Sequence, residues 1–141
     1  MSLSFGNIAL VYGLAALVFF LIDLFWLGFV AKGLYDRYLG GFLRDQVNWT
    51  AALLFYAVYL SGILVFVVLP TLQDGTGVLR AALLGGFLGF LAYCTFDLTS
   101  LALIRGWPLT IAIVDIAWGT VLTGSTSAAV VWLARAILNI A

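Results

Sequence analysis

Hydrophobic residues fill four long stretches of the chain, and polar residues gather in the shorter segments between them. The stretches cover residues 8–30, 50–69, 79–104 and 109–138. A helix needs about 17–25 apolar residues to cross a bilayer, because each residue advances it by about 1.5 Å. All four stretches meet this requirement. The pattern predicts an all-α polytopic membrane protein, with one domain over residues 1–141 and four transmembrane helices.

The segments between the stretches predict how the helices connect. Residues 73–77 and 105–108 are short and contain glycine or proline, which end helices. Short connections make consecutive helices antiparallel neighbours, so an antiparallel bundle is expected. In the longer first connection, apolar and charged residues recur at helical spacing: Leu34, Tyr35, Tyr38, Leu39, Phe42 and Leu43 alternate with Lys32, Asp36, Arg37, Arg44 and Asp45. This pattern predicts an amphipathic segment in the headgroup layer, interrupted at Gly40 and Gly41.

Composition agrees with a membrane protein and excludes several functions. The chain is 65% hydrophobic and 9% charged, whereas soluble domains average about 45–50% apolar and about 25% charged residues. The net charge of zero, without a basic block, argues against a nucleic-acid partner. The absence of histidine removes the usual axial ligand of haem and the usual base of a nucleophilic triad. The only lysine, Lys32, lies at a helix end, so a retinal Schiff base is not expected, and no other cofactor is indicated.

The distribution of basic residues predicts an orientation. Four basic residues lie in the first and third connections and two at the opposite side: Lys32, Arg37, Arg44 and Arg105 against Arg80 and Arg135. Cytoplasmic segments carry the excess of lysine and arginine. We therefore expect both connections to be cytoplasmic and both termini to be periplasmic, in a bacterial inner membrane.

Three of the six aspartates fall inside the hydrophobic stretches, at matching positions. Asp23 and Asp97 each lie seven residues before the end of a stretch, and Asp115 lies six residues after the start of one. At about 1.5 Å per residue, all three are about 10 Å from the same membrane face. Tyr56 reaches a similar depth. The spacing predicts a shared intramembrane site.

Small residues accompany these aspartates at helical spacing. One stripe contains Gly86, Gly89, Tyr93, Asp97 and Ser100, and another contains Asp115, Gly119, Leu122 and Thr126, with Trp118 beside it. Small residues let helix backbones approach closely in lipid, so the aspartates should face protein. Trp107 and Tyr38 are typical of interfacial anchors.

The charges within the expected site do not balance. An ionised aspartate at the centre of a transmembrane helix costs about 2.5–3.5 kcal/mol. Arg105 is the one basic residue placed to reach Asp97 or Asp115, and we expect a hydrogen-bonded pair there, with Lys32 as a weaker counter-ion. One arginine cannot neutralise three carboxylates, so the site must bind protons, bind a cation or keep its acids neutral. If a metal is held, Asp23, Asp97 and Asp115 are its expected ligands.

Five sequence blocks carry a resemblance to a known family. They are DLFWLG at 23–28, LFY at 54–56, YCTFDLT at 93–99, RGWP at 105–108 and DIAWG at 115–119. With them the chain resembles a bacterial family of small four-helix inner-membrane proteins of unknown function. Phe96 stands where tyrosine is common, and Ser100 where asparagine is expected. The resemblance implies a four-span fold in a bacterial inner membrane and implies no particular activity.

Three functions remain open from the sequence. The first is proton or cation binding or transport by Asp23, Asp97 and Asp115, with Arg105, Tyr56 and Tyr93 as further candidates. The second is a non-catalytic accessory or scaffold subunit of a membrane complex. The third is an intramembrane enzyme acting on a lipid or another apolar substrate. The lipid bilayer is the expected partner in each case, and a homo-oligomer or a larger membrane complex would help to enclose a pathway.

Overall fold

Long runs of apolar helix-forming residues make the protein helical almost throughout. The computed structural model describes residues 3–43 and 46–140, and within these ranges it contains helices and no strand. Arg44 and Asp45, which the sequence pattern assigns to the amphipathic segment, lie outside the described residues.

Four helical segments are long and apolar enough to cross a membrane. The first combines α1 (Phe5–Phe25) with the π-helical η1 (Trp26–Val30), and the second combines α3 (Trp49–Ile63), the π-helical η2 (Leu64–Val68) and α4 (Leu69–Asp74). The third is α5 (Val78–Leu103) and the fourth is α6 (Leu109–Leu138). The predicted all-α, four-span fold is confirmed. Side-chain caps start two of the segments, since Ser4 and Asn48 accept hydrogen bonds from backbone N–H groups.

The second span is longer than the sequence pattern indicates. The pattern ends it at residue 69, before Pro70, and assigns Gln73 and Asp74 to a turn, but the helix continues to Asp74. Pro70 lies in the first turn of α4, directly after the π-helical η2 and within one continuous span. The helix ends at Gly75, whose left-handed backbone (φ 69°) suits glycine.

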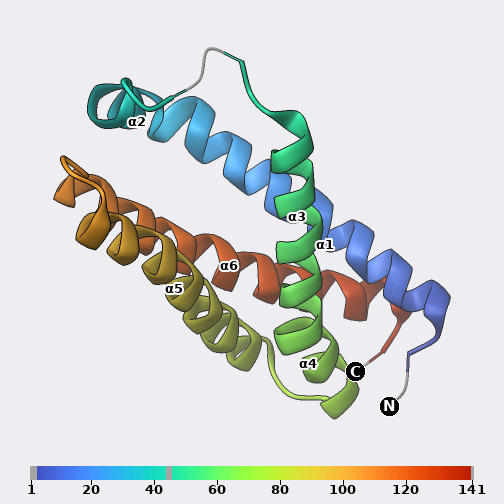
Figure 1. The fold of residues 1–141 in the computed structure, drawn as a ribbon. Coiled ribbons are helices and arrows are strands. Elements are labelled where there is room, and N and C mark those ends of the chain that lie inside the picture. The colour runs from blue at the N-terminus through green and yellow to red at the C-terminus, as the bar shows by residue number, and fades with distance from the viewer. Residues whose placement is uncertain (1–2, 44–45, 141) are drawn as a thin grey trace.

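A short amphipathic helix follows the first span, as predicted. This helix, α2, runs from Lys32 to Leu39 and ends at Gly40. The two glycines therefore end the helix, because glycine weakens helical structure and adapts to turns. In Figure 1, α2 lies at the same end of the molecule as the turn between α5 and α6, and both termini lie at the opposite end.

The α5–α6 pair forms the closest helix contact and runs antiparallel around a tight turn (Figure 1). Gly106 has φ 80° in that turn, a conformation that favours glycine. A side chain on Gly89 would collide with the Gly119 carbonyl, and one on Gly124 would lie 2.9 Å from the Ala82 carbonyl. The glycines thus allow the two backbones to approach closely, as the small-residue pattern predicts.

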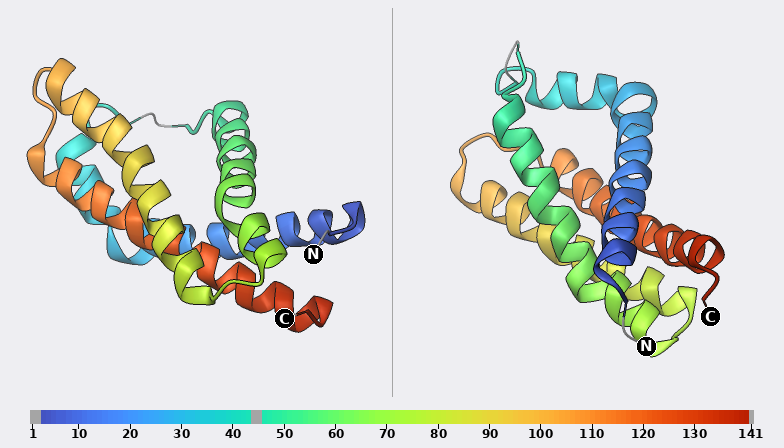
Figure 2. Two further views of the ribbon diagram at one scale, coloured as in Figure 1. Left: turned by 90° about the horizontal axis from the view of Figure 1, so that it is seen from below. Right: turned by 90° about the vertical axis from the view of Figure 1, so that its right-hand side faces the viewer.

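The remaining spans pack less evenly. α1 contacts α6 and α3; the Tyr12 hydroxyl donates to the Ala57 carbonyl at 2.8 Å, and Phe19 packs edge-on against Tyr56 and Tyr59. Most contacts of the second span with α5 and α6 come from its later part, η2 and α4. Figure 2 shows α3 separating from the α5–α6 pair towards the α2 end of the molecule. A cavity lies between α3 and the α5–α6 pair.

Candidate functional site

The three intramembrane aspartates all lie towards the α2 end of the bundle. Asp23 lies in α1, seven residues before the end of the first span at Val30, and Asp97 lies in α5, six before Leu103. Asp115 lies in α6, six residues after Leu109. At about 1.5 Å per residue these positions are about 9–11 Å from the helix ends.

Asp23 joins three helices through its carboxyl group. The Tyr56 hydroxyl donates to Oδ2 at 3.0 Å, and the Trp118 indole N–H donates to Oδ1 at 3.3 Å. Tyr56 lies in α3 and Trp118 in α6. Both oxygens of Asp23 are therefore hydrogen-bonded, which suits a structural role between helices.

A pair of stacked tryptophans connects Asp23 to Asp115. The rings of Trp26 and Trp118 stack with centroids 4.4 Å apart and an interplanar angle of 6°. The Trp26 indole N–H donates to the Tyr35 hydroxyl at 3.4 Å, and that hydroxyl donates to Asp115 Oδ1 at 2.8 Å. The network thus runs from α3 through α1 and α6 to the amphipathic helix α2.

Tyr35 brings a fixed donor from the amphipathic helix to the carboxyl group of Asp115. Burial raises the pKa of the Tyr35 hydroxyl well above its ordinary value, and the neighbouring Asp115 carboxyl adds to this effect. The phenol consequently keeps its proton at neutral pH. It acts as a hydrogen-bond donor to Asp115 and not as an anion.

Asp97 has a different environment from Asp23. Its side chain is 0% exposed, and neither carboxyl oxygen has a hydrogen-bond partner among the described residues. It lies beside Asp115 and the indole of Trp107. The indole nitrogen of Trp107 is also buried without a hydrogen-bond partner in the described part of the chain. Two adjacent carboxyl groups, one fully buried, form the most unusual feature of the protein, since buried polar groups are almost always paired.

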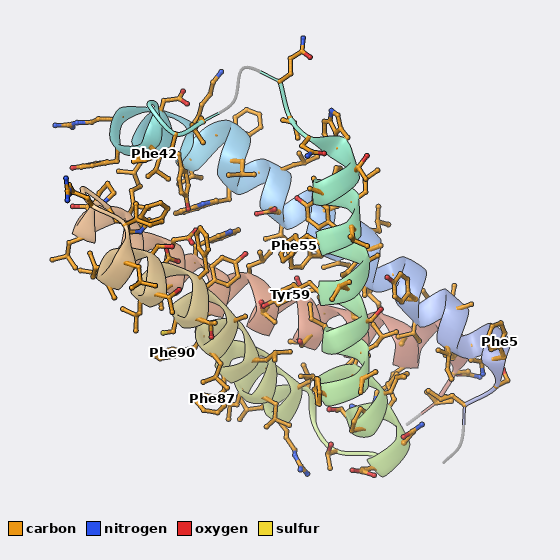
Figure 3. The ribbon with its side chains drawn as sticks, viewed as in Figure 1. Phe5, Phe42, Phe55, Tyr59, Phe87 and Phe90 are labelled. Carbon is orange, nitrogen blue, oxygen red and sulfur yellow. The ribbon has the colours of Figure 1, made fainter. Side chains whose placement is uncertain are left out.

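A cavity of about 280 Å³ lies next to this carboxyl pair. Its wall is formed by α3, α5 and α6 through Phe55, Tyr59, Ala92, Tyr93, Phe96 and Asp115. Figure 3 shows Phe55 and Tyr59 projecting from α3 on the side of α5 and α6. The ring of Tyr93 packs directly on Gly119, so a side chain at residue 119 would displace it. The cavity is mostly aromatic and contains one carboxyl group.

The predicted pair between Arg105 and Asp97 or Asp115 does not form. Arg105 is exposed in the α5–α6 turn, and it makes no hydrogen bond or ion pair with the described residues. Trp107 occupies the space between the turn and Asp97, where its ring packs on Phe42 and Phe96. Lys32 is exposed as well. A guanidinium that stays hydrated avoids the desolvation cost of a buried ion pair, which accounts for the difference.

Asp23 shares no hydrogen bond with the carboxyl pair in the described part of the chain, although it lies within electrostatic reach of Asp115. Among the described residues, no three His, Cys, Asp or Glu side chains come together to hold a metal ion. The stacked indoles of Trp26 and Trp118 connect Asp23 to the other two acids only indirectly. The arrangement is one fully bonded aspartate and one adjacent carboxyl pair.

Comparison with known proteins agrees with a membrane-spanning fold. A family model described as a predicted membrane protein, DUF2177, matches residues 8–132. The chain belongs to the DUF2177 family. No curated protein and no solved structure matches the chain. All the residues of the hydrogen-bond network and the carboxyl pair fall within the part that matches the DUF2177 model.

Sequence reasoning missed four contributors to the hydrogen-bond network and the carboxyl pair. Tyr35 is one of several apolar-face residues of α2, and no sequence signal separates it from Tyr38. Trp26 and Trp118 follow Asp23 and Asp115 by one helical turn, but this spacing does not predict the observed bonds, because Trp118 donates to Asp23 and Trp26 donates to Tyr35. Trp107 is typical of an interfacial anchor, but it is half-buried beside Asp97.

Proposed function

We propose that this protein binds and exchanges a proton at the carboxyl pair of Asp97 and Asp115, as part of a proton-coupled transport function. The observation that carries the proposal is the Asp97 side chain, which is fully buried with both oxygens lacking a hydrogen-bond partner among the described residues. The neighbouring acid is Asp115.

Elementary electrostatics favours a proton in this place. Transferring an unpaired carboxylate from water into an apolar environment is very costly, and two adjacent carboxylates also repel each other. Two basic residues at the α2 end of the bundle, Lys32 and Arg105, are both exposed and form no ion pair with Asp97 or Asp115. One proton held between the two acids removes a charge and supplies a hydrogen bond to Asp97, whose oxygens have no partner among the described residues. Acid pairs that share one proton are a recognised solution to this problem.

The hydrogen-bond network supports a route for protons to the pair. Tyr35 contacts Asp115 from α2, an amphipathic helix suited to the headgroup layer. Displacement of Tyr35 would open Asp115 to water at that membrane face. A proton that enters from the α2 side therefore has Asp115 as its first acceptor and Asp97 as its second.

A proton fits the site better than a hard divalent cation. Calcium takes about 6–8 oxygen ligands, and magnesium is bound through carboxylates together with several waters. The described residues bring no third acid to the pair as a ligand, and each oxygen of Asp23 already accepts one hydrogen bond, from Tyr56 or from Trp118. Two carboxyl groups enclosed by aromatic rings offer few further oxygens.

The proposal includes an orientation in a bacterial inner membrane. Lys32, Arg37 and Arg105 lie at the α2 end of the described structure, and Arg80 and Arg135 lie towards the end with the termini. By the excess of positive charge on the cytoplasmic side, the α2 end faces the cytoplasm and both termini face the periplasm. The carboxyl pair then exchanges protons with the cytoplasm.

Infrared spectroscopy of the protein in lipid nanodiscs tests proton binding directly. We expect the carbonyl band of a protonated carboxylic acid, which disappears as the pH is raised, and we expect Asp97→Asn and Asp115→Asn each to abolish or shift it. Asp36→Asn and Asp74→Asn are matched controls, because both aspartates are exposed. A band that persists unchanged in Asp97→Asn and Asp115→Asn would refute the proposal.

A further inference from the structure

The cavity beside the carboxyl pair combines apolar walls with two polar groups that have unused hydrogen-bonding capacity. The Tyr93 hydroxyl has no hydrogen-bond partner among the described residues, whereas the Tyr59 hydroxyl is bonded to Thr123 Oγ1 at 2.7 Å. Asp115 accepts one hydrogen bond within that part of the chain, from Tyr35. A carboxylate has about four lone-pair sites, so Asp115 has room for further donors.

The mouth of the cavity lies at the depth of the lipid chains. Phe55 and Phe96 form part of its rim and are 48% and 54% exposed. Phe55 lies six residues into α3 and Phe96 seven residues before the end of α5, which places both about 9–11 Å from the helix ends. A bilayer has about 30 Å of hydrocarbon, so a molecule that enters between α3 and α5 comes from the acyl-chain region.

We propose that this cavity binds the hydroxyl end of a lipid alcohol that enters sideways from the bilayer. In the bound state the ligand hydroxyl donates to the carboxyl group of Asp115 and accepts from the hydroxyl of Tyr93. The aromatic side chains enclose the first carbons of its chain. The inference rests on the proposed function to the extent that Asp115 belongs to both sites.

The polar groups select a hydroxyl over other lipid head groups. A phosphate or carboxylate would be repelled by the adjacent acids Asp97 and Asp115. An ammonium group has no acceptor for the Tyr93 O–H, and a carbonyl has no donor for Asp115. An alcohol both donates and accepts a hydrogen bond, so it uses the acceptor of Asp115 and the O–H donor of Tyr93 together. An ammonium could donate to both residues but would leave the Tyr93 O–H without an acceptor.

The size of the cavity limits how much of the ligand it encloses. Pockets that bury a whole drug-sized ligand have volumes of about 300–1,000 Å³, and this cavity has about 280 Å³. It therefore holds the hydroxyl group and the neighbouring carbons, and the rest of the chain remains among the lipids. A single-chain alcohol and a diacylglycerol share this chemistry.

The test is photolabelling of the full-length protein in nanodiscs with a diazirine-bearing hexadecanol, with labelled residues identified by mass spectrometry. We expect saturable labelling concentrated on the rim residues Phe55 and Phe96. Unlabelled hexadecanol should compete, and its methyl ether should compete about tenfold less well because it cannot donate to Asp115. Diacylglycerol as a second competitor distinguishes the two sources of the hydroxyl group.

Three variants sharpen the result. Ala92→Phe fills the cavity and should abolish saturable labelling, whereas Ala102→Phe, the same change at an exposed position of α5, should leave it intact. Tyr93→Phe keeps the ring that packs on Gly119 and removes the hydroxyl, so alcohol binding should weaken about tenfold. Tyr93→Phe keeps the test decisive even where Ala92→Phe fails to fold.

Two outcomes would overturn the inference: labelling spread evenly over the lipid-facing surface, or equal competition by the alcohol and its methyl ether. The carboxylic-acid infrared band, measured on the same samples, separates this failure from failure of the proposed function. A band that still depends on Asp97 without alcohol binding refutes the lipid-alcohol site alone. Alcohol binding that depends on Tyr93 without such a band refutes proton binding alone.

Discussion

At the residue scale, Asp23 and Asp97 differ in what their carboxyl groups contact. Asp23 accepts hydrogen bonds from Tyr56 and Trp118, and these bonds hold α1 to α3 and to α6. Asp97 is more deeply buried and has no hydrogen-bond partner among the described residues. The first arrangement stabilises the fold, and the second costs stability that a purely structural residue would not require.

The contrast predicts opposite effects of the same substitution. Asp23→Asn exchanges one acceptor oxygen for an NH₂ donor and should lower the free energy of unfolding by about 1 kcal/mol, within the range measured for hydrogen bonds between membrane helices. Asp97→Asn removes an ionisable group and replaces the proposed shared proton by an amide N–H that can donate to Asp115, so stability should be unchanged or higher. Unfolding by denaturing detergent in micelles measures both. Asp36→Asn serves as the exposed control, and destabilisation by Asp97→Asn that exceeds that of Asp23→Asn would contradict this assignment.

The positions of the acids, but not their partners, could be predicted from the sequence. The shared depth of Asp23, Asp97 and Asp115 follows from helical rise alone. The partners depend on how the helices rotate about their axes, and the sequence leaves this rotation open. For the same reason the spacing allowed Arg105 to reach Asp97, although the indole of Trp107 lies there instead.

At the scale of elements, glycines decide how closely α5 and α6 approach. Gly89 faces the Gly119 carbonyl and the Thr123 side chain without room for a Cβ atom. Gly86 lies about one helical turn before Gly89. A Cβ atom on Gly86 would lie 3.7 Å from Thr120 Cγ2, an ordinary contact distance. The two glycines therefore form a matched pair on one helix.

Gly89→Ala should separate α5 from α6 and lower the free energy of unfolding by about 1–3 kcal/mol, the usual cost of overpacking. Gly86→Ala should change it by less than about 0.5 kcal/mol or stabilise the protein, because alanine favours the helix and fits the available space. Thermal unfolding in detergent measures the difference. Equal effects of the two substitutions would show that the backbones are not in close contact at Gly89.

The boundaries of the elements were predicted less well than their number. The lengths of the hydrophobic stretches determine four spans. Whether a proline or glycine ends a helix depends on the conformation of the preceding turn, which the sequence does not show. The π-helical η2 precedes Pro70, and the helix continues past it to Asp74. The π-helical η1 at Trp26–Val30 has no sequence signal that we recognise.

At the scale of the whole molecule, the position of α3 could not be predicted from the sequence. Short connections predict antiparallel neighbours, and α5 and α6 are such a pair. The longer connection before α3 imposes no such constraint, so α3 separates from the pair and leaves the cavity between Phe55, Tyr59 and Tyr93. Shape complementarity among side chains determines this angle, and hydrophobic periodicity does not encode it.

The proposed orientation of the whole molecule can be tested with reporter fusions. A reporter fused after Ala141 should be active as a periplasmic fusion, and one inserted after Arg105 should be active as a cytoplasmic fusion, because basic residues are more frequent on that side. Alkaline phosphatase and a fluorescent protein report the two compartments. Cytoplasmic activity at Ala141 would reverse the orientation and place proton exchange on the periplasmic side.

The bonds of Asp23 also have a consequence for biosynthesis. A chain is made from its N-terminus, so Tyr56 reaches the membrane well before Trp118. Until α6 is inserted, the carboxyl group of Asp23 has only one of its two partners, and the tryptophan stack with Trp26 is missing. Unpaired polar groups inside a bilayer are costly. A chain that stops before α6 therefore leaves an acidic side chain incompletely bonded in lipid, and insertion of α6 completes these contacts.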